Sequence, residues 1–558
     1  MAISHRWITD DAFIDLRVVN NIVAGHGPVF NVGERVEAYT NPLWIIVLSI
    51  ARFALPWVTT ETAMVVLGIF FTTLGVIVGT LATVRFARPI SLGLVVPTGA
   101  IVVASIDAMW WFSTSGLETG LLFGWLGLSW WALVRHLPAG GAQIYKTSAA
   151  LFGLGVLIRP DAGFFSICFF ASLLLIEGQR RRLSRGRAVA LLVSFLAVPL
   201  ASELFRIAYF GLLVPNTALA KSGFSLEPSQ GLLYLEDFLH SSYLWIPGLI
   251  LGVVLTSRLI RWWKYGLRLE AAIITIVACG AILDGLYVVA IGGDFMHARM
   301  FLPGFFLLSI LSWLDLGEPL ERRRPLTFLL TWSVVSLIFF RYPSIIINQY
   351  GITNERQVYI ASSQNLNPVE LTNYAKTWNF QHGHADQILA NKLRHERLGG
   401  QIVSVCHCGL MGPGGWTTFE TPARSPLPEV VFANAPSLGI WSVAAGPDVY
   451  IFDNFGLSNP IGSHFILTGH RTPGTADITD NTWMLARFAE RAPAISKLTH
   501  VLAIERRAIS CQPLSGYLRA IDAPLSWSTI WTNIEHSLTW TTMKFPSSPL
   551  AAERQLCH

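Results

Sequence analysis

Two adjacent carboxylates, Asp10 and Asp11, open a helical pattern near the start of the chain. Apolar residues recur at helical spacing from residue 13 to residue 23 above a polar face, which predicts an amphipathic helix lying along a membrane surface. One carboxylate there could serve as a catalytic base or a metal ligand, with its neighbour tuning or orienting it. The competing interpretation is that the pair caps its own helix and complements the helix dipole.

Four cationic side chains have the chemistry of an anion site: Arg159, Lys221, His297 and Arg299. Each lies at the outer end of an apolar run, and His297 and Arg299 flank one residue shortly after Asp294. This pattern predicts an anion site at the membrane edge. The alternative for Arg299 is that it extends from its span to the membrane surface or pairs with Asp294.

Two further positions have both a functional and a structural interpretation. Arg159 stands two residues before Asp161 with Pro160 between them, a pattern that favours a helix-ending turn with an internal ion pair over substrate contact. Glu118 begins an apolar run, where helix capping competes with a role in binding substrate.

The elements that must position these residues are mostly membrane spans. Of 558 residues, 13% are charged and 52% are apolar, and the mean hydropathy is +0.48. These values exclude an ordinary soluble enzyme and a disordered chain, and a net charge of +5 is too small to indicate nucleic-acid binding. Ten apolar runs predict spans at 62–84, 90–106, 117–135, 147–158, 163–178, 188–208, 243–260, 271–291, 299–316 and 326–341.

Basic residues gather in alternate loops between these runs. Sixteen of them fall in the loops that would face the cytoplasm if the N-terminus lies outside: Arg85, Arg88, Arg135, Lys146, Arg180, Arg181, Arg182, Arg185, Arg187, Arg258, Arg261, Lys264, Arg268, Arg322, Arg323 and Arg324. The other loops carry chiefly Arg159, Lys221 and Arg299. This asymmetry predicts that both polar ends of the chain face the extracytoplasmic side of the plasma membrane.

The chain divides into three predicted segments. Residues 1–61 form an extracytoplasmic loop, in which the apolar stretch 42–58 is interrupted by Arg52 and is expected to lie in the membrane interface. Residues 62–341 form the transmembrane domain, and 342–558 form a water-facing domain of mixed α/β structure. Because the chain opens without an apolar segment, we expect a first transmembrane helix to precede residue 1 in the full protein.

Cysteines and tryptophans in the last segment leave several interpretations open. Cys406 and Cys408 are a weak zinc signal, and a disulfide, with Cys511 as the expected partner, is favoured outside the cytoplasm. Cys168 and Cys279 lie within spans as small apolar residues. The tryptophans stack on sugar rings or, for the larger share, form core: Trp378, Trp416, Trp441, Trp483, Trp527, Trp531 and Trp540.

The order of these features resembles the polytopic glycosyltransferases of the C type (GT-C), which use lipid-phosphate sugars. More closely, residues 6–44 and the motifs PNTALAK (215–221), GGDFMHAR (292–299), DNFGLSNP (453–460) and GHRTPG (469–474) resemble the mycobacterial and actinobacterial terminal arabinofuranosyltransferases, the AftB family. The resemblance runs to about residue 488. Each motif alone is weak, whereas the combination in this order is specific.

The resemblance implies a membrane enzyme that moves arabinofuranose from decaprenyl-phosphoryl-arabinose to the ends of cell-wall arabinan, in arabinogalactan and lipoarabinomannan. It places the catalytic carboxylate at Asp10 or Asp11, and acceptor contacts or domain packing at Asp453, His470 and Arg471. Donor and product linkages are both β in this family, so the carboxylate could be a nucleophile or an ion-pair stabiliser instead of a base. A requirement for a divalent cation is left open.

Two other functions stay as alternatives. One is transfer of another polyprenyl-phosphate sugar, such as mannose or glucose, on the same scaffold. The other is a non-catalytic transporter or envelope scaffold, although the predicted spans are nearly free of charge and no repeat is found.

Overall fold

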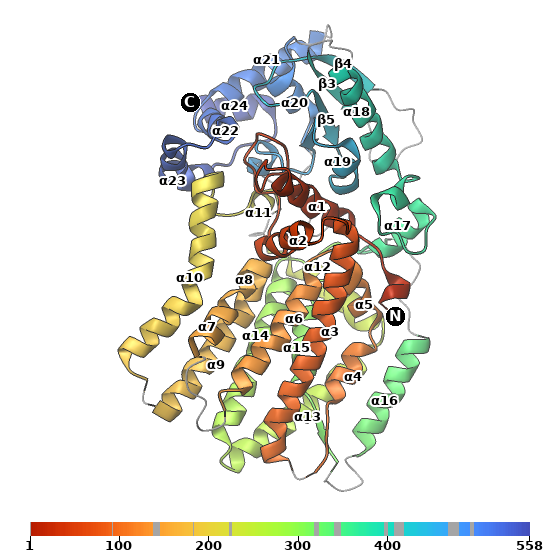
Figure 1. Cartoon of the computed structure of the whole chain (residues 1–558), viewed down its shortest axis with the longest axis vertical. Helices are drawn as coiled ribbons and strands as arrows, with labels where there is room; N and C mark the ends of the chain where they lie inside the picture. Colours follow the sequence, from red (N-terminus) through yellow and green to blue (C-terminus); the bar gives the residue numbers. More distant parts are fainter. Residues whose placement is uncertain are drawn as a thin grey trace. The chain divides into compact units, whose positions relative to one another are not determined.

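The computed structural model describes residues 2–91, 93–137, 145–181, 183–221, 226–316, 323–339, 347–395, 400–406, 418–466, 479–491 and 496–558. The chain forms two compact units (Figure 1). The first comprises Met1–Trp7, Met64–Ala201 and Ser225–Val358, and the second comprises Ile8–Ala63, Ser202–Phe224 and Tyr359–His558. The segment after residue 7 therefore folds with the C-terminal part of the chain.

Five described helices are long and apolar enough to cross a bilayer. They are α3 (Thr60–Ala87), α9 (Gly163–Arg181), α10 (Arg185–Phe210), α13 (Trp245–Lys264) and α14 (Arg268–Ala290). A sixth span results if α5 (Asp107–Thr114) and α6 (Thr119–Val134), which meet at an angle of 111°, count as one. The chain is thus a polytopic helical membrane protein, as its composition predicts.

The number of spans is a correction to the ten that the apolar runs predict. The runs at 90–106 and 299–316 form only the short helices α4 (Thr98–Ala104) and α15 (Leu302–Ile310) with the two-stranded sheet of β1 (Val95–Val96) and β2 (Leu314–Asp315). The run at 147–158 forms α7 (Tyr145–Gly153) and α8 (Gly155–Ile158), and the last run forms α16 (Arg323–Ile338). Short helices can be as apolar as spans, so hydropathy alone does not separate them.

Glycines let two of these helices approach closely. A side chain at Gly120 on α6 would lie 2.5 Å from the carbonyl oxygen of Gly68 on α3, and one at Gly127 would lie 2.3 Å from that of Gly75. Such small-residue contacts are typical of helix packing in membranes, where close backbone approach replaces the hydrophobic effect. They fix α3 against α6, whose first residue follows Glu118.

The second unit is built on a four-stranded sheet in the order β4-β3-β5-β6. The strands are β3 (Gln401–Cys406), β4 (Thr418–Ala423), β5 (Val431–Ala435) and β6 (Val449–Asp453). β4 is antiparallel to β3, whereas β5 is parallel to β3 and β6. Every residue of β5 and β6 is buried, as expected for central strands covered on both faces. The mixed α/β prediction for this segment is confirmed.

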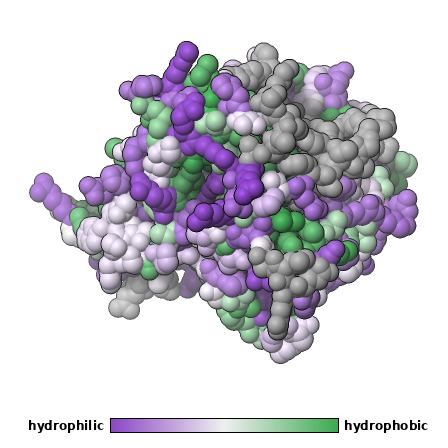
Figure 2. Space-filling view, turned by 90° about the horizontal axis from the view of Figure 1, so that it is seen from above, coloured by the Kyte–Doolittle hydropathy of each residue, from purple (hydrophilic) through white to green (hydrophobic). Residues whose placement is uncertain are grey.

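Helices α18 (Trp378–His395), α19 (Gly439–Ala445) and α20 (Asn481–Phe488) contact this sheet. The other helices of the second unit are α1 (Asp10–Val23), α2 (Pro42–Ala54), α11 (Asn216–Ala220), α21 (Ser496–Ser510), α22 (Leu514–Asp522), α23 (Trp527–Thr542) and α24 (Pro549–Cys557), and α17 (Glu355–Ser363) includes the last residues of the first unit and the first of this segment. Figure 2 views the end that carries α21 in Figure 1, where hydrophilic residues cover much of the coloured surface.

The disulfide in this unit differs from the prediction. Cys511 is bonded to Cys557, which ties the end of α21 to α24. Cys511 is therefore not the partner of Cys406 or Cys408, and Cys408 lies outside the described residues. The true partner is the penultimate residue of the chain, and cysteine spacing alone does not define connectivity. Cys168 and Cys279 are unpaired and lie in α9 and α14, as predicted.

Candidate functional site

Asp10 begins α1, and its carboxylate holds the start of another helix. It accepts hydrogen bonds from the backbone N–H groups of Gly439 (2.9 Å) and Ile440 (2.8 Å), which begin α19, and from the Ser437 hydroxyl (3.0 Å). Asp10 is 7% exposed, and this burial raises the pKa of its carboxyl while the backbone bonds oppose the rise. The carboxylate thus acts as a cap, on α19 instead of on its own helix.

The contact between α1 and α19 requires glycine at position 439. A Cβ atom there would lie 1.7 Å from the carbonyl oxygen of Asp10 and 2.6 Å from its carbonyl carbon. Both are backbone atoms, so no side-chain movement relieves the overlap. Asp10 and Gly439 therefore form one packing unit.

Asp11 is placed differently from its neighbour. It is half-buried where Asp10 is buried, and its negative charge contributes to raising the pKa of Asp10. The three hydrogen bonds described above go to Asp10. Of the two predicted catalytic carboxylates, Asp11 is therefore the one whose side chain is more accessible to a substrate.

Arg17 fixes the rest of α1 against the sheet, and the sequence did not single it out. Its buried guanidinium donates to the carbonyl oxygens of Phe30 (2.8 Å), Val449 (2.8 Å) and Ser442. Burial lowers the pKa of Arg17 to about 10, and the negative charge of Glu429 opposes this. An arginine on an amphipathic helix is usually solvated, so only the fold identifies this one as structural.

Two motifs far apart in sequence meet in the second unit. Asn216, in PNTALAK, donates from Nδ2 to the carbonyl oxygens of Gly456 (2.9 Å) and Leu457 (3.0 Å) in DNFGLSNP. Asp453 is fully buried at the end of β6 and accepts from the N–H groups of Phe455 (2.8 Å) and Ser458 (2.9 Å). Burial raises its pKa to about 6, and the charge of Lys221 opposes the rise. Lys221 and Asp453 are therefore neighbours, whereas His470 and Arg471 lie outside the described residues.

The first unit contains a cluster of arginines and carboxylates at the ends of its helices. Arg159 forms a two-pronged pair with Asp161, with its Nε 3.1 Å and its Nη2 2.6 Å from the carboxylate oxygens. Glu118 Oε1 lies 3.9 Å from Arg159 Nε and 3.5 Å from Arg299 Nη2, and Arg299 Nη1 lies 3.5 Å from Asp294 Oδ2. Four predicted site residues, Glu118, Arg159, Asp294 and Arg299, are thus brought together.

Carboxylates pair with most of the positive charge in this cluster. The pairs are those of the two structural alternatives given by the sequence, Arg159 with Asp161 and Arg299 with Asp294. Within Arg159, Asp161 occupies one edge of the guanidinium, whereas Nη1 is buried and has no hydrogen-bond partner among the described residues. A buried guanidinium N–H without a partner is costly and suits an anionic or polar ligand.

Asp284, which the sequence did not single out, lies within the span α14 near this cluster. Its side chain is 1% exposed, neither carboxylate oxygen has a partner among the residues described, and it is in electrostatic range of Asp161 and Arg159. Ionisable groups inside a membrane span are rare and usually functional. One carboxylate in an apolar run leaves the run intact, which is why hydropathy overlooks it.

His297 pairs with a carboxylate of α12 (Pro228–His240). Its Nδ1 lies 2.5 Å from Asp237 Oδ2, and Asn348 donates to Asp237 Oδ1 at 3.0 Å. Ala298 has a φ of 65°, an uncommon value for a residue other than glycine, at the point where the chain turns from His297 to Arg299. His297 is therefore held by a carboxylate, which sets its tautomer and orientation.

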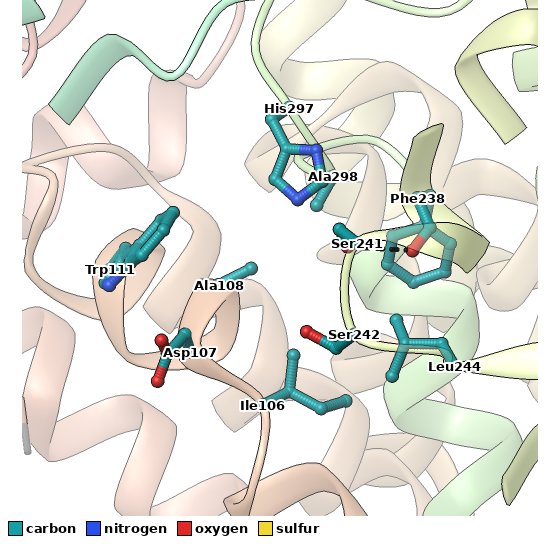
Figure 3. Close-up of a pocket in the computed structure, with 10 residues that line it drawn as sticks. All are labelled: Ile106, Asp107, Ala108, Trp111, Phe238, Ser241, Ser242, Leu244, His297 and Ala298. Atoms are coloured by element: carbon teal, nitrogen blue, oxygen red, sulfur yellow. Dashed lines mark hydrogen bonds between the residues drawn. The ribbon is translucent and has the colours of Figure 1, made fainter. Parts of the chain in front are cut away.

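A small cavity lies beside His297 (Figure 3). The loop after α14 supplies His297 and Ala298, α5 supplies Asp107, Ala108 and Trp111, and the end of α12 with the residues after it supplies Phe238, Ser241, Ser242 and Leu244. The cavity has an empty volume of about 260 Å³ and lies wholly within the first unit. Across the described ranges, no group of three or more His, Cys, Asp or Glu side chains is arranged to hold a metal ion.

The tryptophans singled out in the sequence of the second unit differ in exposure, and Trp378 is half-buried. Trp441, Trp483 and Trp540 are buried, in agreement with a core role. Trp527 and Trp531 are 80% and 66% exposed. Trp416 lies outside the described residues.

Two curated proteins are similar to this chain along nearly its whole length. The terminal β-(1→2)-arabinofuranosyltransferase of Mycobacterium tuberculosis is 28% identical over 598 aligned residues, which cover 98% of this chain and 93% of that protein. The enzyme of the same name from Corynebacterium glutamicum is 28% identical over 96% of this chain and 82% of its own length. No family model and no solved structure matches the chain.

Proposed function

We propose that this chain, a homologue of the two terminal β-(1→2)-arabinofuranosyltransferases, is a membrane glycosyltransferase that adds arabinofuranose to the ends of cell-wall arabinan. The observation that carries the proposal is the similarity to such an enzyme over 98% of the chain. The membrane helices fit a donor with a lipid tail, for which we propose decaprenyl-phosphoryl-arabinose.

Asp11 is the proposed catalytic carboxylate, and Asp10 the residue that positions it. Both oxygens of Asp10 are engaged at the start of α19, so its role is to fix the first turn of α1. Asp11, one residue on, is more exposed. As the anomeric carbon loses its phosphate it gains positive charge, which a carboxylate stabilises as a nucleophile or as an ion-pair partner. Either role is compatible with retention of the β configuration.

The leaving phosphate needs a positive partner, and we assign it to Arg159 and Arg299. Arg159 Nη1 is a buried donor without a hydrogen-bond partner among the described residues, while Asp161 holds the opposite edge of the same guanidinium. Glu118 and Asp294 would orient the arginines. Lys221 and His297 stay as secondary phosphate candidates, and Asp453, His470 and Arg471 as candidates for acceptor contact.

Loop charge supports an extracytoplasmic site in the plasma membrane. Helix α3 ends near Arg85, α9 ends at Arg181 and α14 begins at Arg268, all in the basic loops. The opposite ends of α9 and α14 adjoin Asp161 and Asp294. Because basic loops remain in the cytoplasm, the arginine cluster is expected on the other face, and we propose the same side for the second unit.

The donor is the property to test. Purified chain in lipid vesicles is incubated with an arabinan acceptor and either decaprenyl-phosphoryl-arabinose or decaprenyl-phosphoryl-mannose, each labelled in its sugar. We expect transfer of arabinose alone, with the product released by an enzyme specific for β-(1→2) arabinofuranosyl linkages. Transfer of mannose would favour another sugar on the same scaffold, and transfer of neither would contradict the enzymatic assignment.

A further inference from the structure

Helix α23 presents an apolar face that no described residue of the second unit covers. Trp527, Trp531, Ile534 and Leu538 are 80%, 66%, 40% and 63% exposed. Their spacing of four, three and four residues places them within an arc of about 60° on the helix. Exposed apolar stripes of this kind mark an interaction surface, since isolated apolar residues on a protein surface are scattered instead of aligned.

A different face of α23 is fastened to the end of a membrane span. Asn533 Nδ2 donates to the carbonyl oxygens of Ala208 (2.8 Å) and Tyr209 (3.3 Å) in the last turn of α10. Thr541 accepts at 2.8 Å from the N–H of Leu213, just beyond that turn. The last turn of a helix leaves carbonyl groups without partners inside the helix, and Asn533 satisfies two of them.

The end of α10 lies at the boundary of the bilayer. This helix has 26 residues, so it is about 39 Å long and exceeds the ~30 Å hydrocarbon layer by less than two turns. Leu204 and Phe205, one turn before the contact with α23, are 67% and 47% exposed, as expected of residues that face lipid. Only 6% of the most apolar window of α10 is buried. A helix bound to its last turn is therefore held at the depth of the membrane–water interface.

Helix α2 of the same unit shows the same pattern. Ile46, Ile50 and Phe53 are 49%, 61% and 61% exposed and follow one another at intervals of four and three, and Trp57, in the turn after the helix, is 77% exposed. The sequence independently predicts that this stretch lies in the membrane interface. At 13 residues, or about 20 Å, α2 is too short to cross a bilayer.

We propose that α23 is a second interfacial helix, which inserts its tryptophan stripe into the lipid surface and anchors the C-terminal part of the chain to the bilayer. Tryptophan is enriched at the membrane–water interface because its ring is apolar and its N–H is polar. The aliphatic side chains of Ile534 and Leu538, which follow the two tryptophans along the stripe, suit contact with acyl chains. A sugar site would instead combine aromatic faces with hydrogen-bonding groups.

The test places a fluorophore on this stripe in the full-length chain. In a background lacking the other free cysteines, Trp531→Cys or Leu538→Cys is labelled with a polarity-sensitive dye, and the chain is reconstituted in phosphatidylcholine–phosphatidylglycerol nanodiscs with or without doxyl-labelled lipid. Thr539→Cys, an exposed position on another face of α23, is the matched control. We expect quenching by doxyl lipid that is several-fold stronger at 531 and 538 than at 539, with a blue-shifted emission.

Three results would overturn the proposal. Equal quenching at all three positions would show that the tryptophan stripe does not face the lipid in preference to the other faces of α23. A dye response to soluble arabinan in place of lipid would assign the tryptophans to sugar binding. Energy transfer between labelled copies in one nanodisc, without lipid quenching, would assign the face to self-association. Because the labelled side chains are exposed, folding is expected to survive, and an unchanged thermal unfolding profile checks this for each variant.

Discussion

The acidic pair of α1 and the arginine cluster beside α9 hold buried charge in opposite ways. Asp10 is stabilised by backbone N–H groups at the start of α19, whereas Arg159 is stabilised mainly by the carboxylates of Asp161 and Glu118. In each place one side chain of the predicted site serves the fold. We propose that the chemistry falls to Asp11 in the first case and to the Nη1 edge of Arg159 in the second.

The two regions are also expected to respond differently to substitutions that remove a charged side chain. A carboxylate held by N–H groups leaves neutral polar groups behind when it is removed. An arginine held by carboxylates leaves uncompensated charge, and such charge in a membrane-embedded unit is the more costly defect. The substitutions below separate the two cases.

The largest effect is expected at Asp161. Asp161→Ala strands the Arg159 guanidinium and should destabilise the first unit by about 3–5 kcal/mol. Arg159→Met combined with Asp161→Asn should recover much of that loss, because the double variant buries no unpaired arginine. Unfolding in mixed detergent micelles measures both. The control is Arg507→Gln, which breaks the exposed pair with Glu553 and should leave stability near that of wild type. Equal losses in the single and double variants would show that the pair is not the stabilising contact.

A smaller loss is expected at Asp10. Asp10→Ala removes the acceptor for Gly439 and Ile440 and should cost about 2–3 kcal/mol. Asp10→Ser keeps a capping oxygen and should cost less. Gly439→Ala should destabilise the same contact through its overlap with the Asp10 backbone. Thermal unfolding followed by circular dichroism reports each, with Asp11→Ala as the matched control. If Asp11→Ala destabilised the chain as much as Asp10→Ala, this would contradict a structural role for Asp10 that Asp11 does not share.

The smallest effect is a dependence on pH at Asp386, which accepts a hydrogen bond from Trp441 Nε1 on α19 at 2.8 Å. Burial raises the pKa of Asp386 to about 7 from its ordinary value near 4. Its contribution to stability is therefore complete below pH 4 and is lost as the pH rises through 7. Asp386→Asn should remove this loss, so the variant gains on wild type between pH 4 and 7 by about 1–2 kcal/mol once local relaxation is allowed for. Parallel curves of stability against pH would contradict the assignment.

The sequence predicts the structure best where the residues that determine a feature lie close together in the chain. The helix beginning at Asp10, the membrane composition and the two cysteines within spans follow from periodicity and hydropathy. The number of spans does not follow, because buried short helices such as α4 and α15 are as apolar as spans. The bond of Cys511 to Cys557 required the fold to bring the chain end beside α21.

The sequence predicted several residues of the candidate site, but not which of them contact one another. Spacing marks Asp10 and Asp11 as a pair, yet only the position of α19, more than 400 residues along the chain, distinguishes them. Asp284 and Arg17 carry no local signal, since one sits in an apolar run and the other on an ordinary polar face. Long-range contacts decide such cases, and one sequence does not record them.

The central claim is that Asp11 performs the chemistry while Asp10 holds the scaffold. The most direct measurement is the rate of arabinose transfer per folded molecule for purified Asp11→Asn and Asp10→Asn, with folded protein quantified by size-exclusion chromatography. We predict that Asp11→Asn folds as wild type and loses about 10³-fold or more in rate, whereas Asp10→Asn loses stability but keeps its rate per folded molecule within about tenfold. An Asp11→Asn chain that transfers at the wild-type rate, or an Asp10→Asn chain that folds fully and is inactive, would contradict the account.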